Sequence, residues 1–471
     1  MAGIGFQLKR LFDREGLAGR IQAISYASFV TVGPMLSCML AVTVIHWLLV
    51  QTNAPFHPRE IFQAGVSYAF AFSFIITSPF AMYVTRSVSD QLYEKRYDAL
   101  LPSFYSCMQI TLAVAFVPAF LFALFTPLGL AEKIPLFVLY MELVVIWMEV
   151  VYVSAMKAYR KVAVAFAGGM GVAVLGIWIL LYGSGQAVSA SGLLWGMAGG
   201  FFVTACLLLS EIERFFRTEK PAIPFSFRKD AKRYQSLWFI GLFTGLSMYE
   251  HQFAQWMWNG MWLEDTFRIS PEYDVAVFYA VLSVLPSLIW FVISVETAFY
   301  PKFRQYYDSV IGGGTILDID VARKEMEKVL IGEMAMLMGI QLVFSLIAIA
   351  AGIQFLPLIG FTSQMVDTFN ILVMAFFVYI MTSIVLLLLL YFDDRKGALA
   401  LSALLLAANL VCSWLLRDVQ YQGLPLFAAS ILTLVAALSR LVYRMRRLHY
   451  ATFSAQPLSA SERGMPEKAE A

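Results

Sequence analysis

Residues 371–391 read ILVMAFFVYIMTSIVLLLLLY, a run without a single charged side chain. About 20 predominantly apolar residues are enough for a helix to cross the hydrocarbon core of a bilayer. The rest of the chain shares this character, because 60% of its 471 residues are hydrophobic and only 14% are charged. Ordinary globular chains have about 45–50% apolar and about 25% charged residues. The sequence therefore predicts an all-α polytopic membrane protein.

Apolar runs between charged segments predict twelve transmembrane helices, which the charged segment 211–236 divides into halves of six. The expected spans are 21–50, 62–85, 103–126, 134–156, 162–183, 191–210, 237–259, 275–298, 330–352, 367–391, 397–416 and 424–443. Around them we expect a cytoplasmic interfacial amphipathic helix at 1–20, an N-terminal bundle at 21–210, a cytoplasmic linker at 211–236, a C-terminal bundle at 237–443 and a largely disordered cytoplasmic tail at 444–471. Basic and aromatic residues at corresponding span ends favour a 6+6 pseudo-repeat, although such residues mark any cytoplasmic interface.

The Lys and Arg residues are divided unequally between the two sides of this topology. Thirty of the 34 fall in segments that share a side with both termini. The remaining four are Arg59, Lys133, Arg268 and Arg417. Because loops rich in Lys and Arg stay in the cytoplasm, both termini are predicted to be cytoplasmic.

Recognisable catalytic and cofactor motifs are missing from the sequence. The four cysteines, Cys38, Cys107, Cys206 and Cys412, lie in apolar runs and lack the spacing of a metal or redox site. There is no phosphate-binding loop and no Ser/His/Asp arrangement. We therefore expect a protein that is not an enzyme and has no metal, no cofactor and no nucleic-acid partner.

Two carboxylates interrupt the predicted span 134–156. Glu142 and Glu149 are two helical turns apart, and Tyr152 follows on nearly the same face. Charged groups in a span are unfavourable by about 2.5–3.5 kcal/mol on insertion scales, so they are candidates for function. We predict that these three residues line a substrate passage, while the alternative is a protonated glutamate bonded to a carbonyl group.

The predicted span 237–259 carries the most informative polar pattern. Ser247, His251, Gln255 and Asn259 recur at every fourth residue and form one stripe. Glu250 and Trp258 accompany this stripe. Amides and hydroxyls beside aromatic rings suit carbohydrate, so we predict that all six residues line a water-filled passage for a glycan. The alternative is that they bond neighbouring helices together.

Proline residues inside the spans suggest places where helices bend. Gly33 and Pro34, Pro79 and Pro286 are the hinge candidates, because proline removes a backbone donor from the helix. A static bend is an equally good interpretation. Between the interfaces the spans contain almost no Lys or Arg, so the predicted cavity is non-basic and favours a neutral or cationic cargo.

Three stretches resemble the Pel exopolysaccharide inner-membrane transporters, the PelG-like family. They are MAGIGFQLKRL at 1–11, SYASFVTVGP at 25–34 and Tyr-Glu-His-Gln at 249–252. The resemblance implies membership of the multidrug/oligosaccharidyl-lipid/polysaccharide exporter superfamily, with two six-helix bundles around a central cavity. It further implies a bacterial inner-membrane location and export of an amino-sugar exopolysaccharide. It also implies three partners: a cytoplasmic glycosyltransferase, a cyclic-di-GMP receptor membrane protein and a repeat-containing membrane protein.

Two other functions remain open at this stage. The acidic spans are compatible with an ion-coupled exporter of small cationic compounds. The cytoplasmic connections 86–102, 211–236 and 300–329 are compatible with a membrane scaffold that recruits a polysaccharide synthase. The leading hypothesis is an exporter that moves a Pel-like polymer from cytoplasm to periplasm and works together with a synthase.

Overall fold

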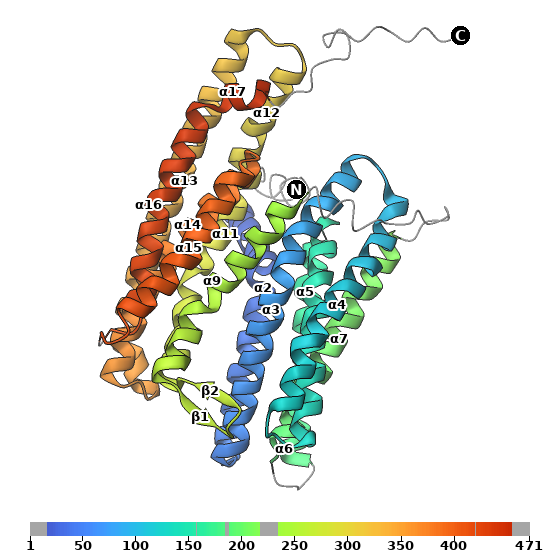
Figure 1. Cartoon of the computed structure of the whole chain (residues 1–471), viewed down its shortest axis with the longest axis vertical. Helices are drawn as coiled ribbons and strands as arrows, with labels where there is room; N and C mark the ends of the chain where they lie inside the picture. The colour runs from blue at the N-terminus through green and yellow to red at the C-terminus, as the bar shows by residue number, and fades with distance from the viewer. Residues whose placement is uncertain (1–16, 157, 184–187, 217–233, 420, 455–471) are drawn as a thin grey trace.

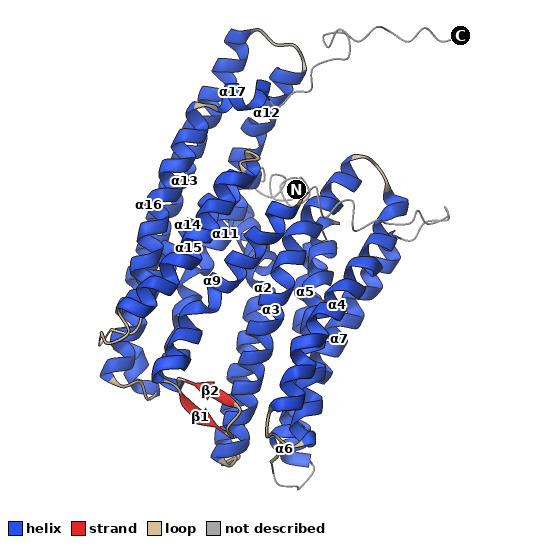
Figure 2. Cartoon of the chain, viewed as in Figure 1, coloured by secondary structure: helices blue, strands red, loops and turns tan. Residues whose placement is uncertain are grey.

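The computed structural model describes residues 17–156, 158–183, 188–216, 234–419 and 421–454. These residues are almost entirely helical, and the sheet they contain is a two-stranded antiparallel hairpin (Figure 2). The prediction of an all-α polytopic membrane protein is confirmed. Most of the predicted amphipathic helix at 1–20 and most of the linker at 211–236 lie outside the described residues.

Six helices form the N-terminal half. They are α2 (Leu17–Gln51), α3 (Phe56–Tyr93), α4 (Leu100–Phe125), α5 (Leu130–Ala155), α6 (Tyr159–Gly183) and α7 (Ala190–Phe216). Each of them contains most or all of one of the first six predicted spans, and the turns between them coincide with the charged or Pro/Gly-containing breaks in the sequence.

The C-terminal half contains the remaining described helices and both strands. They are α9 (Gln235–Asn259), β1 (Met261–Leu263), β2 (Phe267–Ile269), α10 (Pro271–Val281), α11 (Leu285–Ser294), α12 (Tyr300–Ile311), α13 (Ile316–Phe355), α14 (Ser363–Tyr391), α15 (Arg395–Leu415), α16 (Leu424–Arg446) and α17 (Leu448–Ser454). In Figure 1 the two halves lie side by side, and α3 and α9 meet at their border.

The predicted span 275–298 lies within Pro271–Ile311, a segment apolar and long enough to cross a membrane, but it is not one regular α-helix. A 3-10 stretch at Leu282–Val284 separates α10 from α11, and Pro286 lies in the first turn of α11. Proline cannot donate a backbone hydrogen bond and clashes with the preceding turn, so the α-helix is interrupted just before it. Gln341 Nε2 of α13 donates to the Ser283 carbonyl at 2.8 Å and stabilises this break.

Eleven helical segments of the described chain are long and apolar enough to cross a membrane. The predicted seventh span, α9, is not among them, although its 25 residues are sufficient in length. The polar stripe between Ser247 and Asn259 lowers its hydropathy, and a bilayer does not tolerate such a face against lipid. The count of twelve spans and the 6+6 repeat therefore stay predictions.

The segment 300–329 is a helical hairpin rather than an irregular connection. It consists of α12 and the first part of α13, joined at Gly312–Gly314, and α13 starts with a capping box of Thr315 and Asp318. At 1.5 Å per residue the 40 residues of α13 extend for about 60 Å, twice the ~30 Å of the hydrocarbon core. The hairpin therefore projects beyond the membrane-spanning part of the half.

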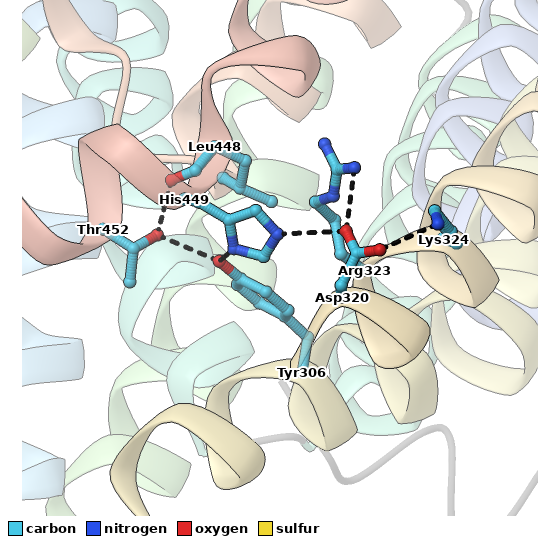
Figure 3. A network of polar contacts seen from close by, with 7 residues as sticks. All are labelled: Tyr306, Asp320, Arg323, Lys324, Leu448, His449 and Thr452. Atoms are coloured by element: carbon cyan, nitrogen blue, oxygen red, sulfur yellow. Dashed lines mark hydrogen bonds and ion pairs between the residues drawn. The ribbon is translucent and has the colours of Figure 1, made fainter. Parts of the chain in front are cut away.

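Polar contacts hold α17 against this hairpin (Figure 3). The Tyr306 hydroxyl donates to Thr452 Oγ1 at 3.4 Å and lies 3.4 Å from His449 Nδ1. His449 Nε2 lies 3.5 Å from Asp320 Oδ1, and Asp320 also pairs with Arg323 and Lys324. In the segment predicted as a tail, 444–471, the residues up to Ser454 are therefore mostly helical, and 455–471 lie outside the described residues.

Candidate substrate passage

The two halves are in contact where α9 crosses α3. Gly241 and Gly245 are one turn apart on the face of α9 that touches Ser78 and Pro79. A Cβ atom at Gly241 would lie 2.8 Å from Pro79 Cα, and one at Gly245 would lie 2.8 Å from Ser78 Oγ. Small residues at this spacing allow helix backbones to approach closely in membranes. The predicted hinge residue Pro79 thus lies inside this contact.

From this contact toward the β1–β2 end, the border between α3 and α9 is aromatic. We call it the aromatic seam. It is made by three ring pairs: Phe74 with Tyr249 (6.0 Å between centroids), Phe72 with Phe253 (5.4 Å) and Tyr68 with Trp256 (4.7 Å). The third pair is stacked, with 4° between its planes. Aromatic faces exposed along a passage are suitable surfaces for the C–H faces of sugar rings.

A largely apolar cavity of about 330 Å³ lies beside the seam, between α3, α4 and α5. Tyr68 and Phe72 of the seam contribute to its wall, together with Phe122 and Tyr140. Lys133 also lines this cavity, so its wall includes one cation. The cavity is lined mainly by the N-terminal half, and Tyr68 and Phe72 belong both to its wall and to the aromatic seam.

The predicted polar stripe of α9 is buried inside the C-terminal half. Ser247, Glu250, His251 and Gln255 are each at most 7% exposed. His251 Nδ1 lies 2.9 Å from the Tyr273 hydroxyl of α10. The partners of the others belong to α15 and to the loop before α16: Asn409 Nδ2 donates to the Ser247 carbonyl (3.4 Å), Ser413 Oγ to Glu250 Oε2 (3.3 Å) and Gln255 Nε2 to the Gln422 carbonyl (3.3 Å).

These contacts are the interhelical kind that the sequence left as the alternative. They account for the folding of a polar helix within the bundle, because each polar group would otherwise be unpaired in a dry environment. Trp258 and Asn259 differ from the rest, since Trp258 is partly exposed and Asn259 is exposed at the end of α9. Asn259 Nδ2 donates to Gln255 Oε1 at 2.8 Å.

The structure does not bring the carboxylates of α5 into contact with the α9 stripe. Glu149 is 1% exposed, and its Oε2 has no hydrogen-bond partner among the described residues. The same holds for Oε2 of Glu142 on the same helix. Tyr152 is fully buried, with its hydroxyl 3.2 Å from Ser103 Oγ of α4. These three residues therefore lie within the N-terminal half.

The other hinge candidates lie in different settings. Pro34 is inside α2, which continues on both sides of it, and a Cβ at Gly33 would lie 3.2 Å from Ala163 Cβ of α6. Pro286 lies at the start of α11, where the helix is interrupted. Each of these prolines thus coincides with a tight contact or a break, and their role as moving hinges stays a prediction.

The sequence interpretation missed the β1–β2 hairpin, which joins the C-terminal half to α3 and α4. The Tyr68 hydroxyl donates to the Arg268 carbonyl (2.8 Å) and accepts from the Arg268 N–H (2.9 Å). Phe267 packs against Phe122 at 6.0 Å, and Glu264 pairs with His57. The alternation of Phe267, Arg268 and Ile269 after two acidic turn residues is the signal that predicts a short strand.

Comparisons with known proteins agree with this architecture. No curated protein matches the chain. Among solved structures, a mutant of the Vibrio cholerae MATE transporter VcmN superposes with a TM-score of 0.64 at 13% identity, covering 96% of this chain and 100% of that one. An outward-facing multidrug resistance MATE family transporter of the MOP superfamily gives 0.60 at 12% identity, with 96% and 99% covered. A MOP superfamily transporter from Pyrococcus furiosus gives 0.54 at 14%, with 91% and 96% covered.

At these identities the likeness to the solved structures shows a shared fold. A comparison with protein families identifies the family of the chain, which the fold alone does not. The PelG model, which describes exopolysaccharide exporters (EPS-E), matches residues 1–453. This covers nearly all of the 471 residues, including the three stretches whose resemblance to PelG-like proteins was seen in the sequence. The chain therefore belongs to the PelG exopolysaccharide exporter family.

Proposed function

We propose that this membrane exporter moves an amino-sugar exopolysaccharide from cytoplasm to periplasm along the border between its two halves, where α3 faces α9. The observation that carries the proposal is the match of residues 1–453 to the PelG family. The aromatic seam, which combines rings from both halves, supports this location of the passage.

The charge of the two helices supports a neutral or cationic cargo. Neither α9 nor the part of α3 between Glu60 and Thr85 contains Lys or Arg. An anionic lipid-linked pyrophosphate would need cations along its path, because Arg and Lys are the side chains that bind phosphate. The seam instead offers aromatic rings, and α9 carries polar side chains behind them.

We assign the polymer-contacting surface of α9 to its aromatic face and to Trp258 and Asn259 at its exposed end. Ser247, Glu250, His251 and Gln255 form the polar layer behind this face, and the polymer reaches them only if α9 also moves away from α10 and α15. Glu142, Glu149 and Tyr152 provide the corresponding polar layer of the N-terminal half. Separation of the halves at Gly241 and Pro79 is the motion that this assignment requires.

We further propose that the protein resides in the bacterial inner membrane with both termini cytoplasmic, and that it works with a synthase. The division of Lys and Arg supports this orientation. The α12–α13 hairpin would then project into the cytoplasm, where a glycosyltransferase can reach it. A cyclic-di-GMP receptor membrane protein and a repeat-containing membrane protein complete the expected assembly.

Secreted polymer, measured in a deletion strain complemented with variants, tests the passage. The double variant Phe72→Ala/Phe253→Ala removes the central pair of the seam and should abolish secretion while the protein remains in the membrane. Phe344→Ala serves as the control, because this phenylalanine on α13 is 45% exposed at the surface of the half. Normal secretion by the double variant at normal protein level would exclude the seam as the passage.

The cation-exporter alternative has a separate test. A deletion strain should keep its normal resistance to cationic dyes and drugs, because the likeness to multidrug transporters extends to the fold alone. If the deletion strain instead loses resistance and the Glu250→Gln variant does not restore it, ion-coupled export of small cations is supported.

A further inference from the structure

A second cavity, of about 250 Å³, lies between the two halves at the end of the molecule that carries the β1–β2 hairpin. The N-terminal half contributes residues of α2 and α3 to its wall, and the C-terminal half contributes residues of α9, β2 and α10. We call it the interhalf cavity. Because its walls belong to both halves, its shape depends on how the halves are placed relative to each other.

The wall of the interhalf cavity is polar at several points. Glu60 of α3 and Asp274 of α10 supply one carboxylate from each half, and both are largely shielded from solvent. His46 and Gln63 also line it, with His46 Nδ1 2.6 Å from Gln63 Nε2. A membrane protein keeps buried carboxylates where they have a partner or a function, because they are otherwise unfavourable.

The two carboxylates differ in how far their acceptor positions are occupied. Asp274 accepts from Trp256 Nε1 at 2.9 Å to each of its oxygens, from the Ser270 N–H at 3.2 Å and from Gln252 Nε2 at 3.4 Å. Glu60 has one charged neighbour, Arg59, at 3.7 Å, which is too long for a hydrogen bond. A carboxylate has about four acceptor positions, so Glu60 can accept donors from a molecule in the cavity, whereas Asp274 contributes mainly its negative charge.

The remaining wall is aromatic. Trp256, Phe278 and Tyr279 line the interhalf cavity beside the carboxylates, and none of its lining residues is Lys or Arg. Carboxylates next to aromatic faces attract a cation by charge pairing and by cation–π attraction, and they disfavour an anion. The volume is below the ~300–1,000 Å³ of sites for drug-sized ligands, so one small group fits.

We propose that the interhalf cavity binds an ammonium-bearing group, with Glu60 and Asp274 as its charge partners and the rings of Trp256, Phe278 and Tyr279 as its walls. Two molecules at this position carry that chemistry: a deacetylated amino-sugar unit of the polymer, and the ethanolamine headgroup of a membrane lipid. The sugar source rests on the proposed export function, whereas the lipid source does not. In both cases binding links residues of the two halves and stabilises the arrangement that encloses the cavity.

Calorimetric titration of the purified full-length protein with a glucosamine trimer tests the sugar source. We expect Glu60→Gln and Asp274→Asn to weaken binding about tenfold or more, since each removes a charged acceptor. Glu272→Gln is the matched control, because Glu272 lies on the same helix as Asp274, is exposed and does not line the cavity. Equal binding of the N-acetylated trimer, or unchanged binding by Glu60→Gln, would overturn this source.

Nanodiscs test the lipid source. If the headgroup is the ligand, phosphatidylethanolamine raises the thermal stability of the wild-type protein above that in phosphatidylglycerol, and Glu60→Gln abolishes the difference while Glu272→Gln keeps it. Failure of both tests overturns the ammonium site. The export proposal fails in a different experiment, namely if a deletion strain secretes polymer normally. The two failures are distinguishable because binding is measured on the isolated protein.

Discussion

The Tyr68 hydroxyl of α3 forms a two-way hydrogen bond with the backbone of Arg268 in β2, donating to its carbonyl at 2.8 Å and accepting from its N–H at 2.9 Å. The same ring stacks on Trp256 of α9. One side chain of the N-terminal half therefore holds both the hairpin and the end of α9. Under the proposed orientation and passage, this end of the border is periplasmic and is the last part that the polymer passes.

Tyr68→Phe should loosen this contact without unfolding the protein. The ring and its stacking remain, while the Arg268 N–H and carbonyl lose their partner, an effect of about 1–3 kcal/mol for a buried polar group. We expect faster amide hydrogen exchange in residues 261–269. Tyr93→Phe is the control, because Tyr93 is 90% exposed. Unchanged exchange in the hairpin would show that Tyr68 does not hold it.

Gly241→Ala should separate α3 from α9. In a helix interior Gly→Ala ordinarily stabilises by about 0.8–1 kcal/mol. Here the new methyl group would meet the backbone of Pro79, so we expect destabilisation by about 1–3 kcal/mol from overpacking. Gly171→Ala on α6 is the matched control, because nothing lies within 4 Å of its Cβ position. Thermal unfolding in one detergent compares the two, and a stabilised Gly241→Ala would contradict the close packing.

His251→Leu, Tyr273→Phe and their combination separate the two interpretations of the α9 stripe. Each single variant leaves the other polar group buried without its partner, and the double variant removes both, so its loss of stability should be smaller than the sum of the single losses. Under the proposed passage, secretion stays impaired in the double variant although stability returns. Recovery of both properties would assign His251 to interhelical bonding alone.

Asp394 and Arg440 form a bidentate ion pair at the start of α15. Arg440 Nε donates to Asp394 Oδ2 at 2.7 Å, and Arg440 Nη2 donates to Asp394 Oδ1 at 2.9 Å. Burial acts to raise the pKa of Asp394, but hydrogen bonds from Arg440 and from the Gly397 N–H outweigh it and lower the pKa below the ordinary value. A lowered pKa means that the stabilisation is complete above the unfolded pKa of about 3.9 and is lost as the pH falls through the folded value.

Asp394→Asn should therefore lower the free energy of unfolding by about 1–3 kcal/mol at pH 7, toward the lower end because Arg440 is partly exposed. The difference from wild type should narrow below about pH 4. Asp393→Asn is the neighbouring control, since the Asp393 side chain is 64% exposed. If the difference in unfolding free energy between Asp394→Asn and wild type stays constant with pH, the ion pair is not its source.

Local pattern was sufficient for the long apolar helices of this fold. Runs such as 371–391 predict helices because hydrocarbon leaves no other way to pair the backbone, and charged breaks mark where they end. Pro286, predicted as a place where a helix bends, lies next to the observed helix break. Local pattern does not show that a Gln341 side chain from another helix stabilises this break. The α12–α13 hairpin was missed because a charged helix outside the membrane has no apolar run to mark it.

The candidate site was predictable only in part. The α9 stripe is evident from its four-residue period, but the period does not say which neighbour it faces. Its partners Tyr273, Asn409 and Ser413 are more than 20 residues away along the chain. Glu60 and Asp274, 214 positions apart, enter one cavity wall only when the two halves are in contact.

By itself the sequence determined that this chain is a bundle of membrane helices with a non-basic polar helix at its centre, because hydrophobicity and charge act on each segment locally. The tertiary structure alone decided that the stripe of α9 turns into its own half, that aromatic rings of α3 and α9 form one seam, and that Tyr68 contacts both the hairpin and the end of α9. The reason is physical: these features are contacts between segments far apart in the chain, and no local pattern specifies which surfaces will meet.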